Sequence, residues 1–350
     1  MKVRYLLALM LCAPLLGGCV KFSGNISAQT EFSRTLFAMD TEMSLKAYGK
    51  HAAAAVNSAA REINRLDHMF DRGSEKSEVY AINTNGSAAV SEDTAAPVAR
   101  ALEISKETDG AFDTSIAPIM DLWGFYTKEY RVPDETELKK ALERVGYNNI
   151  SVDNSTVTVD NGANIDLGGI AKGYLSDRIT EIFKENGVQS GIISLGGNVY
   201  ALGTKPNGSK WRVAIQDPLN TEQYIGSVSV SDTAVITSGG YQRYFIDNNT
   251  IYHHIIDPKT GYPANSGLLS VTIVGGDAAL GDGLSTALFV MGLDKGSDYW
   301  KAHEGFDVVF VTDDGMIHIT EGLDGIFTSD REYELIEKDK ITKALHPLTK

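Results

Sequence analysis

Cysteine is almost absent from this sequence. Only Cys12 and Cys19 occur among 350 residues, and both lie near the N-terminus. After the first 19 residues, the chain therefore has no cysteine for a disulfide or for a cysteine-based metal site.

Positive charge and long apolar runs are also scarce. The chain has 32 Lys and Arg against 46 Asp and Glu, a formal net charge of −14, and no basic stripe. We therefore expect no nucleic-acid partner. Beyond the N-terminus no run reaches the roughly 18 apolar residues of a membrane span. A hydrophobic fraction of 43% is enough for one large domain or two closely packed ones.

The N-terminus has the pattern of a lipoprotein signal. Lys2 and Arg4 precede an apolar stretch at 6–16, and Leu16-Gly17-Gly18-Cys19 follows. This order is typical of a signal peptide, and the last four residues resemble the bacterial lipobox, whose cysteine is lipidated. The alternative is an ordinary secretory signal with an incidental Cys19.

The lipobox interpretation divides the chain into four parts. We expect a signal peptide at 1–18, a tether at 19–31, a folded domain at 32–340 and a tail at 341–350. The mature protein would be lipid-anchored to a membrane of the bacterial cell envelope and face the periplasm.

The pattern of apolar residues predicts an α+β fold. Strands and helices mix without a regular β-α-β rhythm, which disfavours a doubly wound sheet. The expected helices are 52–70, 97–108, 135–145, 168–186 and 281–291. The expected strands are 35–48, 191–201, 211–216, 225–230, 234–237 and 244–256, with a hairpin at 150–159 and two strands within 307–319.

A glycine-rich segment at 165–177 is the most informative. Asp166 precedes Gly168-Gly169, and Lys172 lies in the start of a helix. Glycines let a backbone approach a ligand closely, and a helix N-terminus attracts phosphate. The alternative is a tight strand-to-helix turn with a surface lysine.

Two other segments carry groups suited to phosphate chemistry. Asp282 and Thr286 are four residues apart on a predicted helix and share a face, and their oxygens suit Mg²⁺. The alternative is an aspartate that favours the helix dipole and a threonine that packs on its own turn. His254 precedes a turn at 257–261 and is a candidate general base, or else a structural histidine.

Taken together, these segments resemble the ApbE family of FAD:protein FMN transferases. The matching blocks occur in order along most of the chain. They are Phe37-Ala38-Met39-Asp40-Thr41, 110–113 with Pro118 and 123–125, 165–177, 195–198, 237–239, 254–261, and Asp282 with Thr286. Asp40 replaces the usual glycine of the first block.

The resemblance implies a T-fold type of architecture, with two packed α+β subdomains and FAD in the cleft between them. It also implies roles for individual residues. Mg²⁺ would be held by the carbonyl of Gly169 together with Asp282 and Thr286. FAD would be bound by Met39, Phe70, Ala111, Phe112, Asp113, Asp166, Lys172 and Ile256.

The implied reaction is Mg²⁺-dependent transfer of FMN from FAD to a Thr or Ser hydroxyl of an acceptor protein, with release of AMP. His254 would be the base, and Asp282 would hold the metal and could assist. Implied acceptors include subunits of membrane redox pumps. Two alternatives stay open: an FAD pyrophosphatase, in which water replaces the hydroxyl, and a lipoprotein that binds FAD without chemistry.

Overall fold

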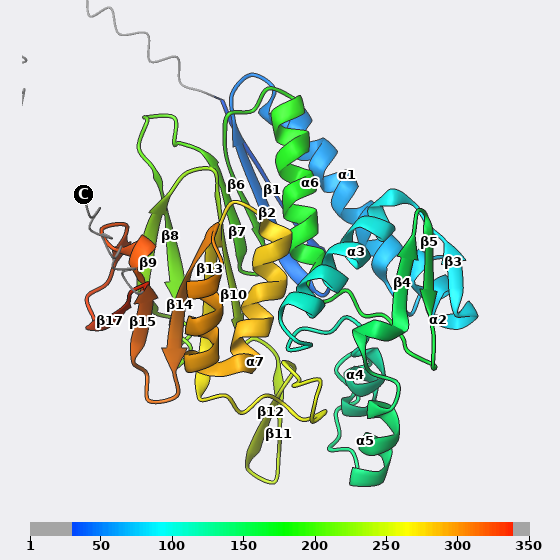
Figure 1. Ribbon diagram of the computed structural model, residues 1–350. Coiled ribbons are helices and arrows are strands. Elements are labelled where there is room, and N and C mark those ends of the chain that lie inside the picture. The colour runs from blue at the N-terminus through cyan, green and yellow to red at the C-terminus, as the bar shows by residue number, and fades with distance from the viewer. Residues whose placement is uncertain (1–29, 339–350) are drawn as a thin grey trace, which may run out of the picture.

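The computed structural model describes residues 30–338. The predicted signal peptide, Cys19, most of the tether and the predicted tail lie outside this range. The described chain mixes helices and strands, which confirms the α+β class (Figure 1). None of its helices is long and apolar enough to cross a membrane.

A nine-stranded sheet forms the centre of the fold. All its neighbouring strands are antiparallel except the last two, which run parallel. Their order across the sheet is β1 (Glu31–Ala38), β2 (Thr41–Tyr48), β6 (Ser190–Leu195), β7 (Asn198–Gly203), β10 (Thr233–Gly239), β13 (Leu268–Gly275), β14 (Phe306–Thr312), β15 (Ile317–Thr320) and β17 (Tyr333–Ile336).

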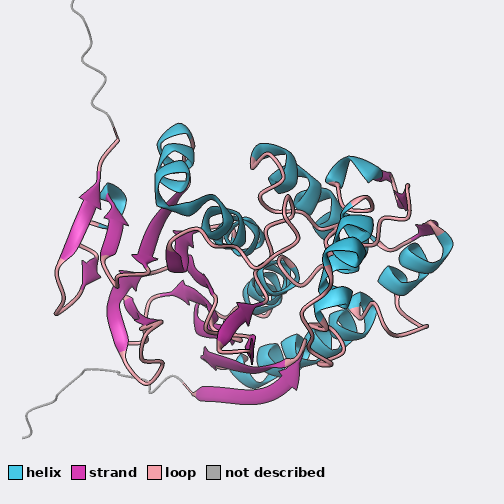
Figure 2. Cartoon of the chain, turned by 90° about the horizontal axis from the view of Figure 1, so that it is seen from below, coloured by secondary structure: helices cyan, strands magenta, loops and turns pink. Residues whose placement is uncertain are grey.

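Helices pack on one face of this sheet and continue beyond its edge. α1 (Ala52–Phe70), α6 (Ala171–Glu185) and α7 (Ala278–Ala302) pack on its strands, and α6 lies between the other two. Figure 2 shows the strands gathered to one side and most helices to the other. Buried aliphatic and aromatic side chains from both layers form the main core, whose burial is the dominant stabilising contribution.

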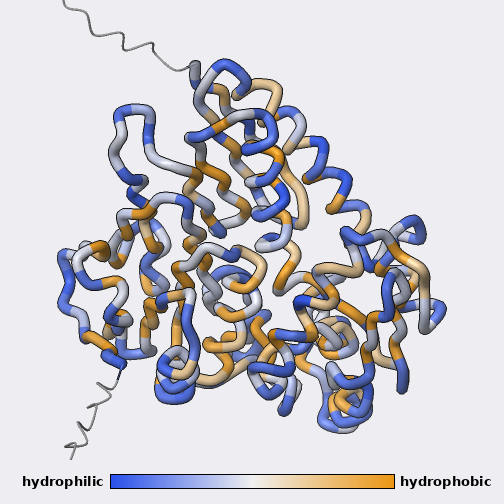
Figure 3. Tube along the Cα trace, turned by 45° about the horizontal axis from the view of Figure 1, so that its top comes forward, coloured by the Kyte–Doolittle hydropathy of each residue, from blue (hydrophilic) through white to orange (hydrophobic). Residues whose placement is uncertain are grey.

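A small sheet covers the opposite face. It has the order β16 (Phe327–Thr328), β9 (Tyr224–Val230) and β8 (Trp211–Gln216). Alternate residues of β8 are buried, as expected for a strand with one face on a core. Figure 3 shows apolar segments in the interior strands and polar ones in the outer loops.

Smaller elements extend from the helical side. A third apolar cluster joins α4 (Ala117–Trp123) and α5 (Glu135–Leu142) to the hairpin of β11 (Tyr244–Asp247) and β12 (Thr250–His253). Trp123 and Phe125 are fully buried in it. The remaining elements are α2 (Glu78–Asn85), α3 (Glu92–Glu107) and the sheet of β3 (Ser87–Ala89), β5 (Thr156–Val159) and β4 (Ile150–Asp153).

Five element predictions are corrected by the structure. The single strands expected at 191–201 and 244–256 are hairpins, β6–β7 and β11–β12, which turn at Gly196-Gly197 and Asn248-Asn249. The single strand expected at 35–48 is a hairpin, because Met39 and Asp40 have φ values of 47° and 60° and turn the chain between β1 and β2. α3 begins at Glu92, so Pro97 lies inside the helix and does not start it. α7 extends beyond Met291, across a non-helical Gly292 with φ 82°.

Candidate active site

The glycine-rich segment is a turn that leads into α6. The backbone N–H of Gly168 donates to Asp166 Oδ1 at 2.8 Å. A side chain on Gly169 would place its Cβ 2.8 Å from Cε2 of Phe112, so glycine is what allows Phe112 to lie against the turn. The predicted residues Asp166, Gly169 and Phe112 thus meet at the start of one helix.

Helices α6 and α7 approach each other closely beside this turn. A Cβ on Gly173 would lie 2.2 Å from the backbone oxygen of Ala278, which only glycine avoids. Asp177 of α6 accepts hydrogen bonds from the N–H groups of Ala278 and Ala279, and burial raises the pKa of this carboxyl to about 6. The first turn of α7 is therefore anchored to α6.

Asp282 is buried at this contact, with 3% of the residue exposed. Its Oδ2 accepts the Gly173 N–H at 2.9 Å, and its Oδ1 accepts the side-chain amide of Asn198 at 2.8 Å. Lys172 Nζ lies 3.5 Å from Oδ1. A buried carboxylate is costly unless it is paired and hydrogen-bonded, and these groups meet that need.

Hydroxyl groups lie beside Asp282 on the same helix. Ser238 lies at the end of β10, and its Oγ is 2.8 Å from Ser285 Oγ and 3.1 Å from Thr286 Oγ1. Ser285 Oγ donates to the Asp282 carbonyl at 2.9 Å. The predicted pair of Asp282 and Thr286 therefore lies beside two further hydroxyl groups, those of Ser238 and Ser285.

The candidate ligands, the Gly169 carbonyl with Asp282 and Thr286, are oxygen atoms of the kind that Mg²⁺ prefers. An α-helical Gly173 N–H would pair with the Gly169 carbonyl, but it donates to Asp282 instead, and no other hydrogen bond to that carbonyl forms within residues 30–338. The Gly169 oxygen is thus left for another partner. No cluster of three His, Cys, Asp or Glu side chains suited to a metal occurs in that range. A magnesium ion here would depend on one carboxylate with neutral oxygens and water, as Mg²⁺ often does.

His254 lies at the end of β12 and is half-buried. Its Nδ1 lies 3.1 Å from the carbonyl oxygen of Arg243. A carbonyl accepts only, so the neutral ring must carry its proton on Nδ1 and present a free lone pair on Nε2. Burial, together with the smaller effects of the nearby charges of Arg243 and Lys172, lowers the pKa of His254 to about 3.

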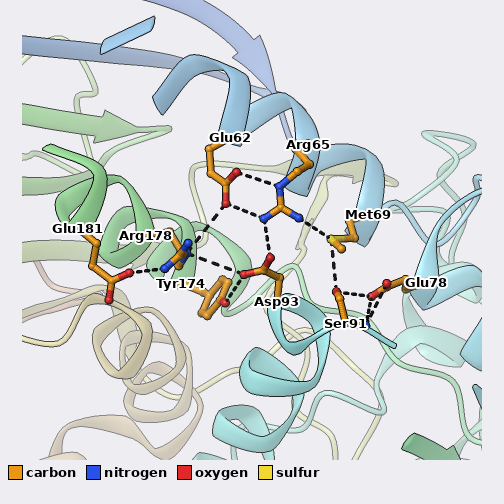
Figure 4. A network of polar contacts seen from close by, with 9 residues as sticks. All are labelled: Glu62, Arg65, Met69, Glu78, Ser91, Asp93, Tyr174, Arg178 and Glu181. Atoms are coloured by element: carbon orange, nitrogen blue, oxygen red, sulfur yellow. Dashed lines mark hydrogen bonds and ion pairs between the residues drawn. The ribbon is translucent and has the colours of Figure 1, made fainter. Parts of the chain in front are cut away.

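Two aromatic rings meet where α1 ends. Phe70 is buried, and its ring centroid lies 6.3 Å from that of Tyr174 on α6. Figure 4 shows how polar contacts join this region: Tyr174 donates to Asp93 of α3, which also faces Arg65 of α1 and Arg178 of α6. The predicted flavin-lining Phe70 thus lies at the end of α1, beside Tyr174 of α6.

Comparisons with known proteins identify the family of this chain. The model of the ApbE family matches residues 39–310. The chain belongs to the ApbE family. It is 32% identical over 341 residues to an FAD:protein FMN transferase of Treponema pallidum, covering 91% of this chain and 92% of the relative. A Klebsiella pneumoniae protein of the same name is 31% identical over 290 residues, covering 80% and 89%.

Solved structures of ApbE proteins share the fold. The ApbE protein of Thermotoga maritima superposes with a TM-score of 0.79 at 34% identity, covering 87% of this chain and all of that one. An apo flavinyl transferase ApbE of Pseudomonas stutzeri gives 0.77 at 28%, covering 85% and 97%. The fold that the sequence resemblance implies is therefore confirmed.

The remaining residues implied by the ApbE resemblance lie on other segments. The Met39 N–H donates to Asp67 of α1 at 2.9 Å. Ala111 is buried beside Phe112, and Ile256 is buried in the third apolar cluster. Within residues 30–338 no polar contact links Met39 or Ile256 to Asp282, so their roles stay predictions.

Asp113 has a different setting from the one that a ligand contact suggests. It is buried, and its carboxylate accepts hydrogen bonds from the N–H and hydroxyl of Ser115 and from the Tyr147 N–H. Burial raises the pKa of this carboxyl, and these hydrogen bonds oppose the rise. Its side chain shapes the loop that presents Ala111 and Phe112.

Several residues of this ApbE site have no role that the sequence predicts. Three polar side chains with no predicted role contact Asp282 or Thr286. They are those of Asn198, Ser238 and Ser285. All three lie within the blocks that match the ApbE family, and this position in the sequence could have marked them as site residues. Arg72, which pairs with Asp166 at 3.1 Å, lies outside every block.

Proposed function

We propose that this protein is a Mg²⁺-dependent FAD:protein FMN transferase. The buried Asp282 carries the proposal, because it joins Lys172 and the N-terminus of α6 to Thr286 at one point. A helix N-terminus and an ammonium group favour phosphate, and the oxygens beside them favour magnesium. The names of the relatives supply the reaction class, FMN transfer from FAD to a protein.

We assign the metal to the Gly169 carbonyl, Asp282 and Thr286. When bound, Mg²⁺ would neutralise charge on the pyrophosphate of FAD and favour departure of AMP. The residues of the chain have separate tasks. Lys172 binds the phosphates, Phe70 and Phe112 line the flavin side, and Asp166 contacts FAD at the glycine-rich turn.

The proposed step is a substitution at the phosphorus of the FMN half. The hydroxyl oxygen of an acceptor Thr or Ser forms a bond to that phosphorus, and the bond from phosphorus to the oxygen of AMP breaks. His254 Nε2 accepts the hydroxyl proton, and AMP leaves with the electron pair of the broken bond. The low pKa makes His254 a weak base, and the negative charge of bound pyrophosphate would raise its pKa.

Two other functions use the same groups. Water in place of the acceptor hydroxyl would make the protein an FAD pyrophosphatase. A lipoprotein that only binds FAD would not need the oxygen group around Asp282 and Thr286, since storage requires no metal. Incubation with FAD and Mg²⁺, with and without acceptor, distinguishes all three by AMP release and by added FMN mass.

Substitution of Asp282 tests the proposal. We expect Asp282→Ala and Asp282→Asn to abolish both AMP release and acceptor flavinylation, because each removes the only carboxylate assigned to the metal. The measurement is mass spectrometry of purified acceptor after incubation with FAD and Mg²⁺.

Asp294→Ala is the matched control, because Asp294 is an exposed carboxylate farther along α7. It should flavinylate the acceptor at the wild-type rate. Thermal melting of each variant reports folding. A folded Asp282→Asn protein that flavinylates normally would remove Asp282 from the site.

The partner and location follow from the same proposal. The proposed acceptors are extracytoplasmic proteins with a reactive Thr or Ser, such as subunits of membrane redox pumps. The enzyme would reach them from a lipid anchor at Cys19, facing the periplasm.

A further inference from the structure

Arg72 is a buried cation beside the glycine-rich turn that the proposed reaction leaves without a task. Its side chain is 10% exposed and lies just after the end of α1. Nε lies 3.1 Å from Asp166 Oδ2, and Nη2 lies 2.7 Å from Asp121 Oδ1 on α4. One guanidinium therefore bridges the turn that starts α6 and a helix of the third apolar cluster.

The ring of Tyr126 holds the guanidinium from a third side. Arg72 Cζ lies 4.0 Å from the centroid of that ring, and the Tyr126 hydroxyl donates to Asp71 Oδ1 at 2.7 Å. A Cβ on Gly73 would lie 1.9 Å from the hydroxyl oxygen, so the missing side chain there makes room for Tyr126. Cation–π contact and two carboxylates thus fix the group in place.

Arg72 lies within ion-pair distance of both carboxylates, but its N–H groups are not aligned for hydrogen bonds to them. Nε and Nη2 are buried, and neither forms an aligned hydrogen bond within residues 30–338. Burial alone would lower the pKa of Arg72, but the charges of Asp166 and Asp121 outweigh it and raise the pKa. The guanidinium therefore stays charged, and its main effect on Asp166 is to neutralise it.

We infer that Arg72 is a positioning residue for FAD binding, acting through Asp166. The inference rests on the proposed function, in which Asp166 contacts FAD beside the phosphate site. Asp166 Oδ1 is engaged by the Gly168 N–H and Oδ2 faces Arg72, so the two contacts orient the carboxylate. Neutralising it also lets the negatively charged pyrophosphate lie nearby without repulsion.

The inference predicts an effect on FAD affinity and not on turnover. In the full chain with Mg²⁺, Arg72→Gln should raise the Kd and KM for FAD about tenfold or more, with kcat within about twofold, since one uncompensated charge remains near the phosphates. Arg72→Lys, which keeps the charge, should recover part of the affinity. Kd is measured by titration of flavin fluorescence, without turnover.

A double-variant cycle connects the effect to Asp166. If Arg72 acts through this carboxylate, Arg72→Gln should weaken FAD binding much less in an Asp166→Asn background than in the wild type. Arg331→Gln is the control, because Arg331 also pairs with a carboxylate, Asp217 at 3.1 Å, but neither residue belongs to a segment assigned to the FAD site. It should bind FAD as the wild type does.

The outcomes separate this inference from the proposed function. Wild-type protein that binds no FAD overturns both. Wild-type protein that binds FAD, with a folded Arg72→Gln variant of equal affinity, overturns only the role of Arg72, as do fully additive effects in the cycle. Where Arg72→Gln does not fold, Arg72→Lys decides: an FAD affinity closer to that of the wild type than to that of Asp166→Asn supports the requirement for charge, and a loss as large as that of Asp166→Asn contradicts it.

Discussion

His254 lies in surroundings that oppose its charged form, which determines how it can act. With a pKa of about 3, the ring is neutral at working pH and Nε2 keeps its lone pair. We expect His254→Ala to slow flavinylation about 100-fold or more, as loss of a general base does, while the Kd for FAD changes little. Single-turnover rates and flavin titration measure the two effects separately.

The pH dependence of the same site follows from the sign of the shift. The folded pKa lies below the ordinary value of 6.5, so the neutral ring favours folding above pH 6.5, and this contribution is lost as the pH falls toward 3. The pH profile of kcat/KM, which reports the free enzyme, should show no His254 inflection near pH 6.5. Equal losses of rate and affinity in His254→Ala would contradict a base role. His253→Gln, one residue earlier, is the control and should keep the wild-type rate.

At the scale of single residues, the sequence predicts the site in part. The four-residue spacing of Asp282 and Thr286 places both on one helical face, and the helix is present. Asn198 reaches Asp282 from 84 positions away, and this contact depends on the order of strands in the sheet. Arg72 meets Asp166 through the placement of α1, which no local pattern encodes.

Asp40 shows how a departure from a family pattern is accommodated. The position has φ 60°, which favours glycine, and aspartate is among the few other residues that adopt it readily. Lys128 Nζ lies 2.6 Å from Asp40 Oδ1 on the exposed surface. An exposed pair of this kind contributes at most about 1 kcal/mol, so the turn itself decides which residue fits.

The crossing of α6 and α7 is the element contact on which the site depends. Gly173 provides both the close approach to Ala278 and the N–H that binds Asp282. We expect Gly173→Ala to destabilise the protein by about 1–3 kcal/mol through overpacking. The roughly 1 kcal/mol of helix propensity that alanine adds is the smaller effect. Chemical denaturation measures the change.

A second glycine tests whether crowding is the cause. Gly276, just before α7, has no atom within 4 Å of an added Cβ and no positive φ. Gly276→Ala should leave both stability and FAD turnover close to the wild type. Equal stability of the Gly173 and Gly276 variants would contradict the packing argument.

At the scale of elements, prediction succeeds where apolar periodicity is strong. The helix at 52–70 is confirmed to the residue, because alanine and aliphatic side chains recur at helical spacing. The hairpin of β1 and β2 is missed because Met39-Asp40 carries no glycine to mark a turn with positive φ. The start of α3 is missed because Pro97 favours a helix start yet is accommodated inside the helix.

The whole molecule combines an acidic domain with an N-terminus that predicts a lipid anchor. We expect mature protein to begin at a lipidated Cys19 and to fractionate with membranes, because Leu16-Gly17-Gly18-Cys19 resembles the lipobox, whose cysteine is lipidated. Cys19→Ser should remove the lipid and release the protein from membranes, or block processing. Mass spectrometry of the mature N-terminus and cell fractionation measure both.

Cys12 supplies the matched control for this experiment, because it lies in the predicted signal peptide and is removed with it. Cys12→Ser should leave lipidation and membrane attachment unchanged. Wild-type protein that starts at another residue and carries no lipid would instead identify an ordinary secretory signal. Because Asp282 and Lys172 lie in the folded domain, unanchored protein should still flavinylate a soluble acceptor at the wild-type rate. Anchoring would then serve to concentrate the enzyme near membrane acceptors rather than to assemble the site.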